Sequence, residues 1–323
     1  MKKLHHRLLL LKPYDNMVEW SKSAIIPGLG KLPLYTVMKF FVQEISRESI
    51  LNKASSLAYN FMLAIFPGII FLFTLIPYIP VENFQDKLLG FLELVIPADA
   101  FKVAKNTLED IIQNQNGGLL SFGFLLAAFF ATNGMTSLMM AFNKSSLTRE
   151  NRKWIVRRLV ALALSFAIIT ALVLGIAVFT GVGIAINYLK KSIDYDLAWL
   201  WTLLLKISRW LILFFIYFIT VGMLYKYGPS QSKYWKIFSP GAMLATILAI
   251  LAFSGFAFYI NNFNAYNKLY GSIGTMIVIM IWMYLNSLIL LVGFELNTSI
   301  ALSKQSIKIV KPKKKNTFRP TST

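Results

Sequence analysis

Six long apolar stretches divide the chain, and they constrain its fold more than any other feature. Each is long enough to cross the hydrocarbon core of a bilayer as a helix, which requires about 20 apolar residues. No segment between them is long enough to form a globular domain outside the lipid. The sequence therefore predicts an all-α, polytopic membrane protein with six transmembrane helices. The stretches cover residues 57–79, 119–142, 159–186, 203–225, 238–260 and 273–301.

The segments that connect these stretches alternate in their content of Lys and Arg. The segments before the first stretch and after the second, fourth and sixth hold 25 of the 33 basic residues, whereas the other three hold six. Short loops rich in Lys and Arg remain on the cytoplasmic side. We therefore expect both termini in the cytoplasm. The net charge of +19 would then lie beside anionic lipid headgroups, and we expect no nucleic-acid partner.

Three regions are expected along the chain: a basic N-terminal cytoplasmic segment over 1–32, a membrane domain over 33–302, and a basic tail over 303–323. The tail lacks apolar periodicity and is expected to be disordered. Apolar residues at helical spacing over 34–45 predict an amphipathic helix on the cytoplasmic face. The first outer loop, 80–118, holds six Asp and Glu residues. Its apolar spacing predicts an outward-facing helical hairpin that caps the bundle.

Small residues recur at four-residue spacing in three of the stretches. This pattern predicts close contacts between helices and therefore a compact bundle. The three strips are Gly123, Ala127 and Ala131; Ala177, Gly181 and Ala185; and Gly241, Ala245 and Ala249.

Glu295 is the only acidic residue within the six stretches. A carboxylate at membrane depth indicates either a functional group, such as a gate or proton site, or a structural ion pair. In the second interpretation Glu295 pairs with a basic residue near the cytoplasmic end. Candidates for this pairing are Arg157, Arg158 and Lys226. On its helix, Glu295 shares a face with Tyr284.

Lys206 and Arg209 lie three residues apart toward the predicted outer end of the fourth stretch, so they share a helix face. Two interpretations fit them. They bind an anionic headgroup or substrate, or they extend to the interface with their aliphatic stems in lipid.

Pro67, followed by Gly68, predicts a break in the first transmembrane helix, because proline removes one backbone donor. Broken helices often line substrate sites in transporters, although kinks without a transport role are also common. The asparagines Asn60, Asn133 and Asn286 are expected to form interhelical hydrogen bonds.

Residues for catalysis are missing from the expected membrane domain. The chain has no cysteine, and its two histidines are His5 and His6. No His and Asp cluster suits a catalytic metal, and no nucleophile stands beside a base. The Gly28–Lys31 segment lacks the spacing of a phosphate loop. We therefore expect no metal, no cofactor and no enzymatic activity.

Two parts of the sequence resemble the YihY/BrkB family of bacterial inner-membrane proteins, once labelled ribonuclease BN. The first is Ala54-Ser55-Ser56-Leu57-Ala58-Tyr59, followed by Phe66-Pro67. The second follows the family through its last two helices: Gly241-Ala242, Tyr259, Tyr266, Tyr270-Gly271-Ser272-Ile273-Gly274, Trp282, Tyr284 and Gly293-Phe294-Glu295. The resemblance covers about residues 35–302. Phe294 departs from the usual alanine, and Ala64 departs from a frequent serine.

The resemblance implies a six-helix protein of the bacterial inner membrane with both ends in the cytoplasm, in agreement with the distribution of charge. Some members are linked to serum resistance, and a part in lipid movement in the envelope has been suggested. The ribonuclease label looks like a misassignment.

The leading hypothesis is a transporter-like protein that moves a lipid or an amphiphilic anion in the cell envelope. Its expected path is formed by Asn60, Pro67, Arg209, Tyr270, Gly271, Gly274, Tyr284 and Glu295. The alternative is a non-transporting scaffold or envelope-integrity factor that binds partners through the outer hairpin and the basic tail. A membrane ribonuclease is disfavoured. The sequence leaves open a homo-oligomer or a protein partner.

Overall fold

The computed structural model describes residues 12–25, 33–47, 50–78, 117–144, 150–192, 195–231, 236–262 and 272–310. All regular secondary structure in these ranges is helical. Six of these helices are long and apolar enough to cross a membrane: α4 (Ile50–Leu75), α7 (Gly117–Asn143), α8 (Trp154–Ser192), α9 (Tyr195–Tyr227), α10 (Pro240–Asn262) and α12 (Ser272–Val310). They correspond one to one to the six apolar stretches, which confirms the predicted fold class. The side of the membrane that each end faces stays a prediction.

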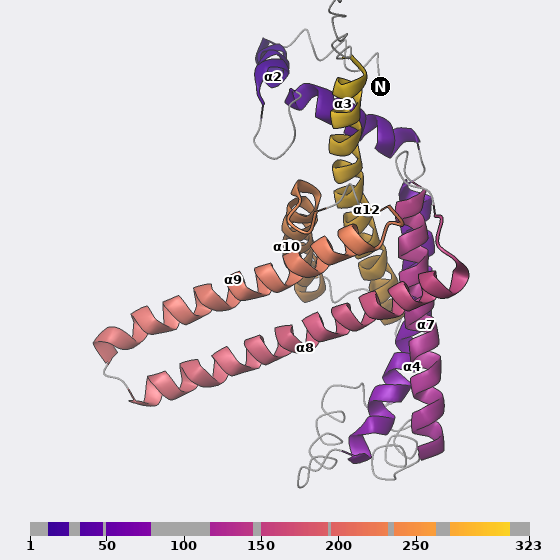
Figure 1. Cartoon of the computed structure of the whole chain (residues 1–323). Helices are drawn as coiled ribbons and strands as arrows, with labels where there is room; N and C mark the ends of the chain where they lie inside the picture. The colour runs from indigo at the N-terminus through magenta and orange to yellow at the C-terminus, as the bar shows by residue number, and fades with distance from the viewer. Residues whose placement is uncertain are drawn as a thin grey trace, which may run out of the picture.

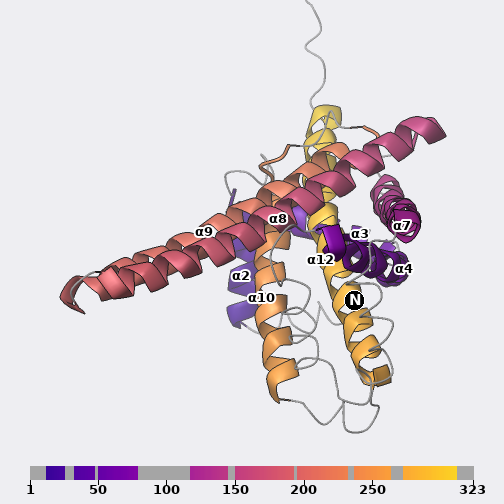
Figure 2. The same ribbon diagram turned by 90° about the horizontal axis from the view of Figure 1, so that it is seen from below.

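The helices form two groups that cross at a steep angle. α4 packs against α7 and α12, and α10 packs against α12. α8 and α9 lie side by side, cross these helices and extend well beyond them to one side (Figures 1 and 2). We call Trp154–Tyr227 the α8–α9 hairpin. A compact bundle was expected from the sequence, and for the projecting part of this hairpin that expectation is wrong.

The length of α8 agrees with a strong tilt in the membrane. Its apolar span, Trp154–Ile186, has 33 residues, so it is about 50 Å long at 1.5 Å per residue. The hydrocarbon core is only about 30 Å thick. A helix longer than the hydrocarbon core is accommodated by tilting, among other adjustments.

The core lies where the helix ends predicted to face the cytoplasm meet. Phe142 of α7 stacks on Phe294 of α12 with 4.3 Å between ring centroids, and Tyr225 of α9 meets Phe142 edge-on at 5.6 Å. All three rings are buried. Aromatic pairs in these geometries add to the stability that burial gives. Four elements are thus joined at one end of the molecule, since Leu57 of α4 belongs to the same core.

Two shorter helices precede the first span, α2 (Lys12–Ser23) and α3 (Leu34–Arg47). α3 is the amphipathic helix that the sequence predicted. It packs against α12 with Val37 fully buried, while Met38 and Val42 remain exposed. An exposed apolar edge beside a buried one suits a helix at a membrane surface.

The predicted break at Pro67 is wrong. α4 is one continuous helix, and Pro67 is buried within it. Contacts with α7 hold the turns beyond the proline in line, since the rings of Phe71 and Phe124 lie 5.4 Å apart. A Cβ atom added to Gly123 would lie 3.4 Å from the Phe71 Cα, so the two helices are closely apposed. The loss of one backbone donor bends or strains a helix but does not end it when neighbours support it.

The three strips of small residues differ in their surroundings. A Cβ atom on Gly241 would overlap the carbonyl oxygen of Gly293, so this strip is a true contact between α10 and α12. A Cβ atom on Gly181 would meet nothing within 4 Å in the part of the chain that the structure describes. Gly181 is therefore not a point of close contact between helices among the described residues.

The boundary of the C-terminal tail also differs from the prediction. α12 continues to Val310, so residues 304–310 are helical and not disordered. Extending an existing helix is far easier than nucleating one, so α12 runs past its apolar part. The rest of the expected tail, the predicted outer hairpin, and Tyr270 with Gly271 lie outside the described residues.

Candidate functional site

Arg209 and Glu295, two residues of the expected path, lie far apart. Arg209 is half-buried on α9, whereas Glu295 is buried on α12. The ring of Tyr225, 16 residues after Arg209 on α9, lies 5.7 Å from the ring of Phe294. Arg209 is therefore about 24 Å along α9 from the contact beside Glu295. The two residues do not belong to one site.

Two asparagines bind their own helices. Asn60 Nδ2 donates to the carbonyl of Ser56 at 2.8 Å, and Asn286 Nδ2 donates to the carbonyl of Trp282 at 2.8 Å. The interhelical hydrogen bonds expected for these two are therefore wrong. A helix carbonyl has a second lone pair that accepts from a short polar side chain four residues later.

The other predicted residues contribute to packing. Tyr284 is half-buried against the core, and Gly274 is buried in the first turn of α12. The backbone carbonyl of Glu295 accepts a hydrogen bond from Ser299 Oγ at 2.7 Å. Whether the Glu295 carboxylate is functional or structural stays a prediction.

Two of the basic residues proposed as ion-pair partners of Glu295 contact aromatic rings. Arg158 lies over the rings of Phe129 and Trp154, at 5.6 and 5.7 Å from their centroids. Lys226 lies over the ring of Tyr227. These are cation–π contacts, which stabilise a charge at a membrane boundary without a carboxylate.

Asn297 joins the start of α10 to α12. Its Oδ1 accepts from the backbone N–H of Gly241 at 2.8 Å, and its Nδ2 donates to Ser239 Oγ at 2.9 Å. The first backbone donors of a helix have no partner within that helix, so Asn297 satisfies one of them from outside. This pairing could not be predicted from local sequence patterns, because Gly241 and Asn297 are 56 positions apart.

Arg152 joins the loop before α8 to the loop after α9. Its guanidinium donates to the carbonyls of Tyr227 at 3.0 Å, Gly228 at 2.9 Å and Pro229. Glu150 Oε1 accepts from the Arg152 backbone N–H at 3.0 Å. Burial lowers the pKa of Arg152, and the charge of Glu150 partly offsets this.

Asn143 completes the same connection. Its Nδ2 donates to Glu150 Oε2, and its Oδ1 accepts from the backbone N–H of Ser230 at 2.9 Å. We call Asn143, Glu150 and Arg152, together with 227–230, the loop clasp. The clasp fixes both ends of the α8–α9 hairpin to the end of α7. The hairpin is therefore held at its base while its other half projects.

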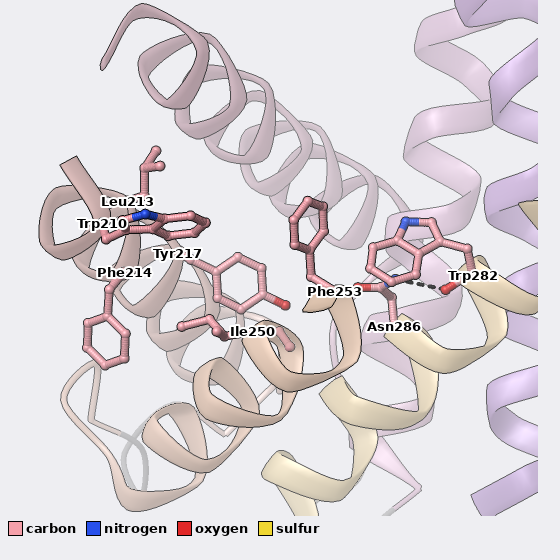
Figure 3. Close-up of a pocket in the computed structure, with 9 residues that line it drawn as sticks. Trp210, Leu213, Phe214, Tyr217, Ile250, Phe253, Trp282 and Asn286 are labelled. Atoms are coloured by element: carbon pink, nitrogen blue, oxygen red, sulfur yellow. Dashed lines mark hydrogen bonds between the residues drawn. The ribbon is translucent and has the colours of Figure 1, made fainter. Parts of the chain in front are cut away.

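A cavity of about 260 Å³ lies between α9, α10 and α12. In Figure 1, α9 runs away from α10 and α12 toward the projecting part of the hairpin, and Figure 3 shows the side chains that line the cavity. Its lining residues come from three helices: Trp210, Leu213, Phe214 and Tyr217 from α9; Ala249, Ile250 and Phe253 from α10; and Trp282 and Asn286 from α12.

The lining is aromatic and aliphatic, and part of it faces outward. Trp210 is 53% exposed and Phe253 is 56% exposed, so the cavity opens at the side of the protein. Figure 3 shows the Tyr217 hydroxyl on the side of its ring nearest α10. Because Asn286 uses its Nδ2 within its own helix, its Oδ1 is left as an acceptor. The cavity can thus hold a hydrocarbon group with a few polar contacts.

Sequence reasoning missed this cavity. The residues from α9 recur every three or four positions, which places them on one helix face. Aromatic residues on a lipid-facing surface show the same spacing, so the pattern alone does not separate a site from a surface. Within the described residues, no group of three or more His, Cys, Asp or Glu could hold a metal ion.

Comparison with known proteins decides the family. The sequence model described as virulence factor BrkB matches residues 41–317. The chain belongs to the virulence factor BrkB family. The matched range includes every residue of the cavity and of the loop clasp. With its six candidate spans, this BrkB family chain is a multi-pass membrane protein.

Relatives of this BrkB family chain occur in different bacteria. YfkH of Bacillus subtilis, whose name describes it as ribonuclease-like, is 33% identical over 258 residues, which are 79% of this chain and 91% of YfkH. A UPF0761 membrane protein of Vibrio campbellii is 27% identical over 287 residues, covering 86% of this chain and 84% of the relative. No solved structure matches the chain.

Proposed function

We propose that this protein is a transporter-like, lipid-handling protein of the bacterial inner membrane. It takes a lipid or an amphiphilic anion from the bilayer into the cavity between α9, α10 and α12. The observation that carries the proposal is this cavity, which is apolar, lined by aromatic side chains and open at the side. We propose this cavity as the binding site, in place of the path through Pro67 and Glu295 that was expected from the sequence.

The chemistry of the lining favours a hydrocarbon group over a water-soluble substrate. A polar substrate would lose its hydration on entry, and the lining would offer few hydrogen bonds in return, from the Asn286 amide, the Tyr217 hydroxyl and the two indole N–H groups. A hydrocarbon chain gains close dispersion contacts with aromatic rings and loses no hydrogen bonds. Lipids also reach a lateral opening directly from the bilayer.

We further propose that both termini lie in the cytoplasm. The contacts at the base of the hairpin support this orientation, because the loop clasp joins two loops that the charge pattern assigns to one side. Asn143 and Ser230 bond across these loops. Arg209 and the opening of the cavity then lie in the outer half of the membrane.

Reconstituted protein tests the proposal. Vesicles of phosphatidylcholine with a trace of NBD-labelled phosphatidylglycerol report transbilayer movement through dithionite quenching. We expect wild type to accelerate this movement. Ala249→Trp fills the cavity and should abolish the acceleration, whereas Leu251→Trp, at an exposed position outside the cavity, should retain it. Movement no faster than in protein-free vesicles would overturn the transport function.

The name of YfkH raises nuclease activity as a second candidate. We propose that this chain is not a nuclease, because its membrane domain has no histidine or cysteine, and the described residues hold no group of acidic side chains that could bind a metal ion. Purified protein incubated with RNA and Mg²⁺ is expected to leave the RNA intact. Cleavage that disappears on a point substitution in this chain would overturn this statement.

The same variant tests the alternative of a non-transporting scaffold. A scaffold would keep its function in Ala249→Trp.

A further inference from the structure

Arg209 is adjacent in sequence to a residue of the cavity and has unused hydrogen-bonding capacity. It immediately precedes the lining residue Trp210, and its guanidinium carbon lies 4.7 Å from the ring centroid of Phe179 on α8. The side chain is half-buried. Its Nε atom is shielded from solvent and has no acceptor among the residues that the structure describes.

The contact with Phe179 orients the guanidinium. A ring attracts one flat face of the cation, while the N–H donors point outward in the plane of the group. A shielded N–H without an acceptor costs free energy, more so when it carries charge. A phosphate or carboxylate fits this planar donor set better than a neutral acceptor does. Arg209 therefore favours an anionic partner at this place.

The spacing along α9 places the anion site and the cavity within one molecule's reach. Leu213 lies one helical turn after Arg209, and Tyr217 lies eight residues after it, about 12 Å along the axis. Lys206 is one turn before Arg209 on the same face and is exposed. An amphiphile with its head at these two cations would direct its chain along the lining of the cavity.

We infer that Arg209, with Lys206 beside it, binds the phosphate of an anionic lipid whose hydrocarbon chain occupies the cavity between α9, α10 and α12. This inference rests on the proposed function and names its substrate class. The charge of the two side chains selects the head, and the aromatic lining accepts the tail. A zwitterionic lipid with the same chains binds more weakly, because its own cation opposes Arg209 and Lys206.

Native mass spectrometry of the full chain in nanodiscs tests the inference. The discs hold equal amounts of phosphatidylglycerol and phosphatidylcholine with the same acyl chains. We expect wild type to retain phosphatidylglycerol about tenfold more than phosphatidylcholine, as for one charge-assisted interaction. Arg209→Gln should abolish this preference. Arg209→Lys, which keeps the charge but loses the planar donors, should retain part of it.

Arg158→Gln is the matched control. Arg158 also lies over aromatic rings but at the other end of the hairpin, so its loss should leave the preference unchanged. If Arg209→Gln does not fold, as judged by its melting curve, the partial loss in Arg209→Lys decides the question. An unchanged preference in that variant overturns the inference.

The remaining outcomes separate this inference from the proposed function. An unchanged preference in Arg209→Gln, with lipid retention lost in Ala249→Trp, overturns the headgroup site and leaves the lipid function standing. Retention of neither lipid by wild type overturns both. Inorganic phosphate alone is the last probe. If it binds wild type but not Arg209→Gln, and displaces phosphatidylglycerol, the site takes a soluble anion and the lipid assignment is wrong.

Discussion

Asn297 on α12 accepts a hydrogen bond from the backbone N–H of Gly241 on α10, with 2.8 Å between Oδ1 and N. The bond requires the two helix backbones to approach closely, and Gly241 and Gly293 allow this because neither carries a side chain. Ala249 lies eight residues after Gly241, about 12 Å along α10. The start of α10 and the part of α12 that it contacts therefore form a fixed base beside the cavity.

Gly241→Ala is expected to destabilise the protein. Its Cβ would overlap the carbonyl oxygen of Gly293 and lie 2.6 Å from Asn297 Cγ. Both neighbours belong to packed helix, so the strain should cost about 1–3 kcal/mol. The melting temperature in detergent measures this effect. Gly255→Ala, on the same helix with nothing within 4 Å of its Cβ among the described residues, should melt at or above the wild-type temperature. Equal melting of the two variants would contradict the close contact.

Arg152→Ala is expected to open the loop clasp. The substitution removes the hydrogen bonds to the carbonyls of Tyr227, Gly228 and Pro229. Bonds to a charged donor contribute about 1.5–3 kcal/mol when buried. Because Arg152 is only half-buried, we expect a total loss of about 1–2 kcal/mol after solvent screening. Limited proteolysis should show faster cleavage near residues 227–231, with a lower melting temperature.

Lys153→Ala is the control for the clasp, since Lys153 is exposed and adjacent in sequence. It should resemble wild type in both measurements. Arg152→Lys should restore only part of the protection, because one ammonium group cannot reach three carbonyls in the geometry of a guanidinium. Full protection in Arg152→Ala would show that the clasp does not hold these loops together.

Pro67→Ala is expected to leave both stability and lipid movement close to wild type. α4 is already continuous through this position, and alanine would supply the backbone donor that the Leu63 carbonyl lacks. The melting temperature should be unchanged or higher. The vesicle assay with NBD-labelled phosphatidylglycerol checks the second expectation. A folded Pro67→Ala protein that no longer moves lipid would restore the first-helix break as a functional feature.

The transmembrane helices could be predicted from sequence because their signal is local. Each apolar stretch satisfies its own backbone hydrogen bonds within lipid, so composition alone identifies it. The arrangement of the helices depends on contacts between distant residues. Arg152 binds carbonyls about 75 positions later, and no periodicity within either segment indicates this. The steep crossing of the α8–α9 hairpin could not be predicted for the same reason.

The candidate site shows a similar division. Arg209 attracted attention because a charge in lipid is costly, and the structure places it beside the cavity. Trp210 and Phe253 gave no such signal, because aromatic residues are ordinary on surfaces that face lipid. Their joint role appears only when α9 diverges from α10. Glu295 carried the strongest sequence signal, yet it lies among packed helices.

Asn286→Leu and Glu295→Gln should therefore separate the cavity from the path expected from sequence. The two residues lie nine positions apart on α12, about 14 Å along the helix. Asn286→Leu keeps the size of the side chain and removes the one amide that lines the cavity. We expect lipid retention in nanodiscs to fall about two- to tenfold, as for one hydrogen bond, with little change in melting. Asn133→Leu on α7, a half-buried asparagine outside the cavity, should retain lipid as wild type does.

Glu295→Gln should show the opposite result, because Glu295 is 5% exposed and surrounded by helix contacts. Replacing a buried carboxylate by a neutral amide changes its charge and hydrogen bonding and should shift the melting temperature, while the cavity beyond it keeps its lining. Native mass spectrometry and melting curves on the same samples compare the two effects directly. If Glu295→Gln abolished lipid retention at unchanged stability and Asn286→Leu did not alter it, the lipid would have to pass Glu295. The cavity between α9, α10 and α12 would then not be the binding site.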